Sequence, residues 1–394
     1  MIPTAVVIYF VVCTGNTQTW ETYIQNKVGL RAIIGSARTP VPNVVELKDL
    51  VLRDFTRGQL LGLDKVTLAR VGNTQRVIVS DVQVKSADLP LLIQRFGAIF
   101  NHSRSKLSTI VQFKQIILIP EQKGQGFVRL FNGQLKSTVN DDTPSLAFDF
   151  SLAPEEKKQC ELTMSLSRVN GKPFTRLILK TNAASIPCWI MSAWDDSFNL
   201  LGNEATFTGE AIGGVSRTQQ FTRLQGKIEH VDMTQLITNN LPHKLDGVAT
   251  ILLNDCLINQ QGIQSMEGRL VSTALPSSRN EVSLSLLSKA QEHLGMNART
   301  NSFTTAPIQY GKIQFDFSLG KNSDSIKLWG TCDPDGQGIA MVDHQGSPIL
   351  QTVEQKLPVA NLIRTFLPDG SQQAITNKGC RQVLALFPQA SQLR

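Results

Sequence analysis

The chain repeats a five-residue pattern: FTGEA at Phe207–Ala211, LQGKI at Leu224–Ile228, LDGVA at Leu245–Ala249 and MEGRL at Met266–Leu270. Successive copies begin 17, 21 and 21 residues apart, and a later copy, LWGTC, begins at Leu328, 62 residues further on. Because alternate residues of a strand share a face, we expect each copy to place two apolar side chains on one face and a glycine on the reverse, where a strand can bend or bulge. The pattern predicts a long, repeatedly folded β-sheet.

The composition also favours strands over long surface helices. The chain has 394 residues, of which 41% are hydrophobic, so it is long enough to bury a substantial core. Only 18% of the residues are charged, and Gln, Asn, Ser and Thr supply much of the polar surface. This composition suits strands that have one solvent-exposed face. We expect a mainly β fold, an elongated antiparallel sheet that forms a groove or an incompletely closed barrel, with a few short helices.

Charge and motif searches exclude several classes of site. The net charge is +7, but no run of four or more Lys or Arg occurs, so we expect no nucleic-acid binding. The six cysteines and five histidines lack metal-ligand spacing, which predicts no metal site and no cofactor. Phosphate-loop, dinucleotide-binding and nucleophile-elbow motifs are absent. These absences predict a protein that is not an enzyme, with no catalytic residues.

Three acidic clusters are alternative candidates for a site: Asn140–Asp142, Trp194–Ser197 and Asp333–Gly336. Paired carboxylates can serve as general acid and base, or bind calcium. Each cluster lies in a stretch rich in turn-forming residues, where Asp and Asn bond local backbone amides. We therefore interpret them as turns, and a glycosidase or calcium site is the alternative.

The N-terminus carries an apolar run from Ile2 to Cys13, which is shorter than the roughly 20 residues that span a bilayer. It is either the remainder of a membrane or signal segment or a buried strand. We divide the chain into an apolar segment with a short helix (1–35), a repeated β-strand region (36–275), and a helix with a second β-hairpin unit and short C-terminal helices (276–394).

Hydrophobic spacing predicts the remaining elements. Strands are expected at Val44–Leu52, Leu63–Val71 and Arg76–Val84, arranged as a meander. Short helices are expected at Trp20–Leu30, at Asp88–Gly97 with Asp88 as N-cap, at Asp232–Ile237 and at Leu357–Phe366, and a longer helix at Glu281–Met296.

The pentapeptide FDFSL occurs twice, at Phe148–Leu152 and Phe315–Leu319. Both copies extend upstream in strict alternation, and each is followed by a second alternating strand, so two equivalent hairpins are predicted. The apolar positions are our candidates for a groove or core lining: Leu146, Phe148, Phe150, Leu152, Ile313, Phe315, Phe317 and Leu319. Alternation does not separate a dry core from an open groove that holds acyl chains, since both require the same side chains.

The repeated pattern of strands resembles that of the AsmA-like group of bacterial envelope proteins, relatives of TamB and of the bridge-like lipid transfer proteins. The residues that carry the resemblance are LRAIIG from Leu30, Val45–Asp54, Val77–Val84 leading into the helix at Asp88, and Leu224–Leu236 followed by Leu245–Ala249. The likeness covers about residues 30–100 and 200–275.

The resemblance implies an inner-membrane anchor at the N-terminus, a periplasmic β-groove, and a non-catalytic part in lipid transport or outer-membrane maintenance. A phospholipid or another acyl lipid is the implied ligand, and other envelope proteins are possible partners. The alternatives are a structural or adhesive β-protein that binds a protein or a glycan, and a secretion-system component similar to type II secretion protein N. An enzyme would require an acidic pair such as Asp195 and Asp196 in a cleft.

Overall fold

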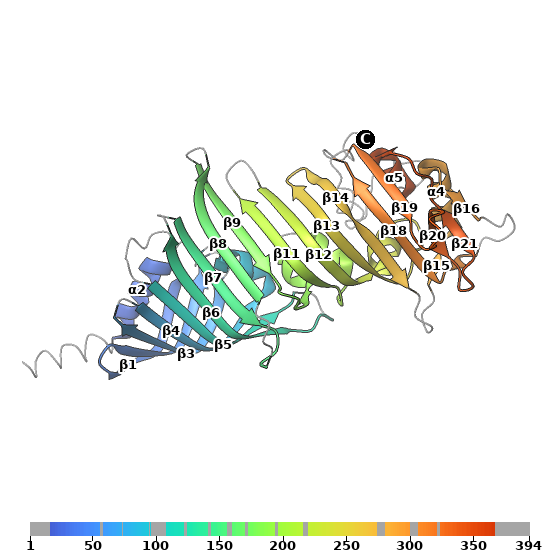
Figure 1. The fold of residues 1–394 in the computed structure, drawn as a ribbon. Helices are drawn as coiled ribbons and strands as arrows, with labels where there is room; N and C mark the ends of the chain where they lie inside the picture. The colour runs from blue at the N-terminus through green and yellow to red at the C-terminus, as the bar shows by residue number, and fades with distance from the viewer. Residues whose placement is uncertain are drawn as a thin grey trace, which may run out of the picture. The chain divides into compact units, whose positions relative to one another are not determined.

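The structure is a computed structural model that describes residues 16–55, 58–72, 74–93, 95, 108–121, 124–140, 143–155, 160–169, 172–193, 196–215, 220–273, 280–299, 306–320 and 324–366. The fold is mainly β with a few short helices, as the sequence predicted (Figure 1). It divides into two compact units, Met1–Ala184 and Ser185–Arg394, which are described separately. The apolar run Ile2–Cys13 lies outside the described residues.

Unit 1 begins with a helix where Trp20–Leu30 was expected, and continues with an antiparallel meander that contains the three predicted strands and a further one at Arg31–Val41. Helix α2 (Thr17–Val28) is capped by the side chain of Asn16, which accepts from the backbone N–H of Gln18, and it ends at Gly29 in the left-handed conformation. The four strands that follow pair in chain order: β1 (Arg31–Val41), β2 (Val44–Asp54), β3 (Gly58–Val71) and β4 (Thr74–Lys85).

The next pair of strands in unit 1 is parallel rather than antiparallel. After β4 the chain forms a 3₁₀ turn at Ser86–Asp88 that continues as helix through residue 93. Asp88 therefore lies inside this helical segment, and the expected N-cap position is wrong, because Lys85 already stands at the cap. Strand β5 (Ser108–Ile119) returns parallel to β4, which a long crossover permits and a tight hairpin does not. This parallel pair was not predicted.

Four further antiparallel strands complete unit 1. They are β6 (Val128–Asn140), β7 (Thr143–Ser151), β8 (Cys160–Val169) and β9 (Lys172–Lys180). Consecutive strands are paired from β5 through β9. The first FDFSL copy lies at the end of β7, and the predicted hairpin with the following strand is formed, since Phe148 stands opposite Leu162 and Phe150 opposite Cys160.

Unit 2 contains the repeated glycine pattern. Its first strands are β10 (Ile186–Pro187), β11 (Thr206–Val215), β12 (Gln220–Asp232), β13 (Val248–Asn259) and β14 (Gly262–Thr273). Two 3₁₀ segments (Cys188–Ala193 and Asp196–Leu201) precede β11. A short π-helix (Thr234–Thr238) follows β12 where a helix was expected, and the Asp232 carboxylate accepts from the backbone N–H groups of Thr234 and Gln235.

The second half of unit 2 joins the same sheet directly. Its elements are β15 (Glu281–Val282), α4 (Leu284–Leu294), β16 (Asn297–Ala298), β17 (Ile308–Gln309), β18 (Lys312–Leu319), β19 (Ser325–Gly330), β20 (Ile339–Val342), β21 (Pro348–Gln351), β22 (Leu357–Pro358) and α5 (Val359–Phe366). Strand β14 pairs with β18, so the sheet continues across the subdivision that we placed near residue 275. The sheet in each unit is open rather than closed into a barrel.

Helix α4 is shorter than the predicted span Glu281–Met296. Glu281 and Val282 pair as a strand with Gln309 and Ile308, and Ser283 caps the helix by accepting from the backbone N–H of Leu286. Gly295 ends it in the left-handed conformation. Local capping and a long-range pairing therefore set both ends, and the apolar spacing alone overestimated the length.

The glycines of the repeated pattern lie on the same face as the two apolar residues that flank them, and our expectation that they lie on the reverse is wrong. The pattern spaces its three marked positions two apart, so all three share one face. Phe207 and Leu224 are buried on this face, while Gly209 and Gly226 stand opposite each other with φ of 153° and 145°. A Cβ on Gly226 would lie 2.2 Å from the carbonyl oxygen of Thr208, so glycine permits the close approach of β11 and β12.

Candidate functional site

The two FDFSL copies occupy equivalent hairpins with different surroundings. In unit 2, Ile313, Phe317 and Leu319 are buried, with exposed fractions of 4%, 8% and 4%, and Phe315 packs against the same cluster. That cluster includes Leu286 and Leu287 of α4 and Val359 and Ile363 of α5, and these two helices contact each other. This apolar face is therefore a packed core.

In unit 1, the corresponding face is apolar but only half-buried at its centre. Leu146 and Phe150 are each 6% exposed, whereas Phe148 is half-buried. Leu152 lies beyond the end of β7, in a bend, so the expected run of four residues on one strand face stops at three in this copy. That the four candidates of unit 1 line a groove stays a prediction.

The half-buried face extends across five strands at the level of Phe148. Phe148 stands opposite Leu135 of β6 and Leu162 of β8, and Leu162 stands opposite Leu179 of β9. On the β5 side, the Phe113 ring meets Phe148 edge-on with 6.1 Å between ring centroids. All five side chains are half-buried. We call this set, Phe113, Leu135, Phe148, Leu162 and Leu179, the Phe148 face.

In each copy one phenylalanine packs over a glycine of the preceding strand, at the first position of the copy in unit 1 and at the third position in unit 2. A Cβ at Gly133 of β6 would lie 3.2 Å from Cε2 of Phe148, and a Cβ at Gly268 of β14 would lie 2.8 Å from Cζ of Phe317. Each ring therefore covers the backbone at a glycine of the neighbouring strand, and this contact compensates for the side chain that glycine lacks.

The aspartates of the two copies point to the opposite face, and each forms an ion pair with the preceding strand of the sheet. Asp149 lies 3.7 Å from the Nζ of Lys136 on β6. Asp316 accepts from Nε and Nη2 of Arg269 on β14, at 2.5 and 2.9 Å. The Asp316 carboxylate raises the pKa of the Arg269 guanidinium. The repeat thus encodes an apolar face and a charged reverse in both units.

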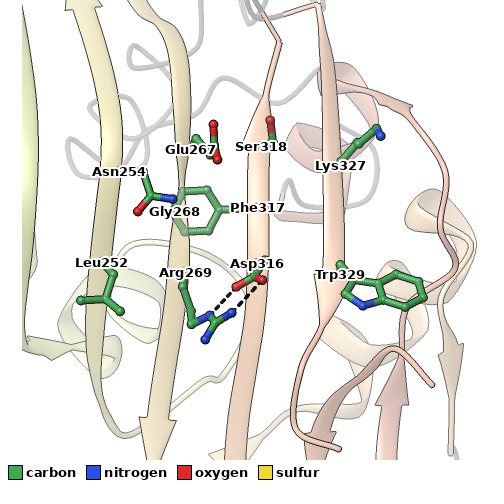
Figure 2. A pocket seen from close by; sticks show the side chains of 10 residues that line it. All are labelled: Leu252, Asn254, Glu267, Gly268, Arg269, Asp316, Phe317, Ser318, Lys327 and Trp329. Atoms are coloured by element: carbon green, nitrogen blue, oxygen red, sulfur yellow. Dashed lines mark hydrogen bonds and ion pairs between the residues drawn. The ribbon is translucent and has the colours of Figure 1, made fainter. Parts of the chain in front are cut away.

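An open hollow of about 450 Å³ lies on this charged face of unit 2 (Figure 2). Two rows of side chains cross four neighbouring strands, β13, β14, β18 and β19, to form it. The first row is Leu252, Arg269, Asp316 and Trp329. The second row is Asn254, Glu267, Ser318 and Lys327.

The hollow was missed by sequence reasoning, because its residues come from separated parts of the chain and form no motif. The usable signal was the alternation itself, since the positions that face the hollow on β18 and β19 are polar or aromatic. Of the acidic clusters considered from the sequence, Asp333 has a turn role: its carboxylate accepts from the backbone N–H groups of Gln337 and Ile339. Residues 141–142 and 194–195 lie outside the described part of the chain.

The described residues contain no group of three or more His, Cys, Asp or Glu side chains arranged to hold a metal ion. Within the same ranges, none of the helices has the length and apolar character needed to cross a membrane. No protein-family model, curated protein or solved structure matches the chain. The functional argument therefore depends on the two surfaces described above.

Proposed function

We propose that the protein binds the acyl chains of a phospholipid or a similar lipid on the Phe148 face of unit 1. The observation that carries the proposal is the contrast between the two FDFSL copies. In unit 2 the pattern packs against a core cluster that includes α4 and α5, although Phe315, the counterpart of Phe148, is itself half-buried. In unit 1 five apolar side chains on five adjacent strands are half-buried. Apolar area that the fold leaves partly accessible is available to an apolar ligand.

The energetics of such binding are favourable without any chemical step. Five strands at about 4.8 Å spacing give an apolar path of about 19 Å across the sheet. Each methylene that moves from water onto this path contributes about 0.8 kcal/mol. The role that fits is passive: the face lowers the cost of holding or moving a lipid tail in water, and no catalytic residue is required.

The resemblance to AsmA-like proteins supports a location for this activity. On that basis we propose a periplasmic protein attached to the inner membrane through its N-terminus, which acts in lipid transport or outer-membrane maintenance alongside other envelope proteins. The alternative is a structural, adhesive or secretion-system module in which both apolar faces are packed protein cores that bind no lipid.

The test is native mass spectrometry with lipid extraction on the full chain purified in mild detergent. The variants Phe148→Thr and Leu162→Thr make the centre of the Phe148 face polar. Gln112→Ala is the matched control, because Gln112 is exposed on β5 between Val111 and Phe113 and points to the opposite face. Circular dichroism and the unfolding midpoint report whether each variant stays folded.

We expect phospholipid to co-purify with the unmodified chain and with Gln112→Ala, and to be lost from the two threonine variants. A folded, lipid-free protein that takes up no phospholipid from added vesicles would overturn the proposal in favour of the dry-core alternative. Lipid retained equally by all variants would place any lipid site elsewhere and would also overturn it.

A further inference from the structure

The hollow on the charged face of unit 2 carries an inference that is independent of lipid binding. Its second row contains side chains with unused hydrogen-bonding capacity. Among the residues that the structure describes, Glu267 and Lys327 have no ion-pair partner, and Asn254 and Ser318 have no side-chain hydrogen bond. All four side chains are exposed, so they are available to a ligand.

The geometry keeps the acid and the amine of this row apart. Ser318 of β18 lies between Glu267 of β14 and Lys327 of β19, so the two charged residues are separated by two strand spacings, about 10 Å. The short serine side chain leaves space between them (Figure 2). A ligand that fills this space meets an acceptor on one side, a donor on the other, and a hydroxyl that serves as both below it.

The charges of the hollow cancel. Arg269 and Asp316 neutralise each other through their two hydrogen bonds, and Glu267 balances Lys327. A site with no net charge does not favour a phosphate group or a cation over a neutral ligand. Leu252 is the one aliphatic side chain in the two rows, and it is 36% exposed, while Phe317 also lines the hollow.

An indole ring borders the same space. Trp329 stands opposite Asp316 in the first row and is half-buried. Its Cη2 atom lies near Gly338, since a Cβ built there would be 3.3 Å away. In Figure 2 the indole of Trp329 extends from β19 on the side away from Asp316, as a flat apolar ring.

We propose that this hollow binds a neutral saccharide. Sugar hydroxyls both donate and accept, so one uncharged ring can satisfy Glu267, Lys327 and Ser318 together. The C–H face of a pyranose ring matches the apolar face of Trp329. The volume of about 450 Å³ lies within the range of small-molecule sites and accommodates one or two sugar units.

The test is calorimetric titration of the full chain with maltohexaose, cellohexaose and chitohexaose, and separately with inorganic phosphate and phosphoethanolamine. Trp329→Ala removes the platform. Ser318→Leu fills the space between Glu267 and Lys327 without removing either charged group. Gln225→Ala is the matched control, since Gln225 is exposed on β12, outside the two rows.

We expect at least one oligosaccharide to bind, and we expect both Trp329→Ala and Ser318→Leu to raise its Kd by about tenfold or more. Gln225→Ala should leave the Kd unchanged. If Trp329→Ala does not fold, Ser318→Leu decides the matter by itself. The proposal is overturned if none of the three sugars binds at concentrations up to about 10 mM, if folded variants bind as well as the unmodified chain, or if phosphate or phosphoethanolamine binds and the sugars do not.

Discussion

Arg269 of β14 and Asp316 of β18 stand directly opposite each other, and the guanidinium donates two hydrogen bonds to the two carboxylate oxygens. Both side chains remain substantially exposed, at 43% and 41%. Bidentate geometry favours the pair, whereas solvent exposure screens it. This ion pair therefore aligns β14 with β18 and contributes little to overall stability.

A double-mutant cycle between these two residues tests that balance. We expect a coupling free energy of no more than about 1 kcal/mol between Arg269→Met and Asp316→Asn, decreasing as salt is added. The measurement is urea unfolding of the unmodified chain, both single variants and the double variant. A coupling of several kcal/mol that is insensitive to salt would contradict the exposed-pair interpretation.

Two phenylalanines at different positions of the two copies, Phe317 (third residue) and Phe148 (first residue), should differ in their contribution to stability. We expect Phe317→Ala to lower the free energy of unfolding by about 3–5 kcal/mol, because the ring is 8% exposed within the core below α4 and α5. Phe148→Ala should cost about 1–2 kcal/mol, because its ring is half-buried and less apolar area is lost. Urea unfolding checks both values, and equal losses would contradict the difference in burial between the two rings.

Replacement of Gly226 should be strongly destabilising. An added Cβ would meet the carbonyl oxygen of Thr208 and the Cα of Gly209, 2.2 and 2.7 Å away, on a backbone with φ of 145°. We expect Gly226→Ala to destabilise unit 2 by more than about 3 kcal/mol. Gly126→Ala is the control, because a Cβ there meets nothing within 4 Å. Thermal unfolding midpoints compare them, and similar midpoints would disprove the close-approach argument.

Two buried thiols should be unreactive in the folded protein. Burial raises the pKa of Cys188 and of Cys256 to about 12. Because the thiolate is the reactive form, we expect neither residue to be alkylated by iodoacetamide at about pH 8 until the chain unfolds. Peptide mapping by mass spectrometry measures this, with denatured protein as the reference. Rapid alkylation in the native state would mean that the core of unit 2 opens readily.

The turn at Asp333 should give the stability of unit 2 an acid-dependent component. Hydrogen bonds from the backbone N–H groups of Gln337 and Ile339 lower the pKa of the Asp333 carboxyl below its ordinary value of 3.8. A lowered folded-state pKa contributes stability that is present above the unfolded pKa and is lost as the pH falls through the folded pKa.

The Asp333→Asn variant tests this dependence. It should be less stable than the unmodified chain near about pH 5, and the difference should shrink as the pH falls toward about 2. Chemical unfolding across that range provides the measurement. A difference that stays constant with pH would assign the effect to packing rather than to the carboxylate.

Local features of the fold were predictable from the sequence. The hydrophobic spacing predicted a helix at Trp20–Leu30, where α2 spans Thr17–Val28, and the strict alternation around Phe148 and Phe315 predicted both hairpins. Where sequence reasoning was wrong, a competing interaction decided the outcome. Residues 281–282 pair with β17 instead of starting a helix, and the parallel pairing of β5 with β4 depends on a crossover that no local pattern records.

The sequence by itself determined which side chains share a face, because a strand alternates with a fixed period of two wherever it lies. It therefore specified two matching apolar faces and two matching aspartates on their reverse. Only the tertiary structure decided that α4 and α5 cover one of these faces, and that Glu267, Ser318, Lys327 and Trp329 meet in one hollow. Both outcomes depend on pairing between segments far apart in the chain, and the period of a strand carries no information about its neighbours.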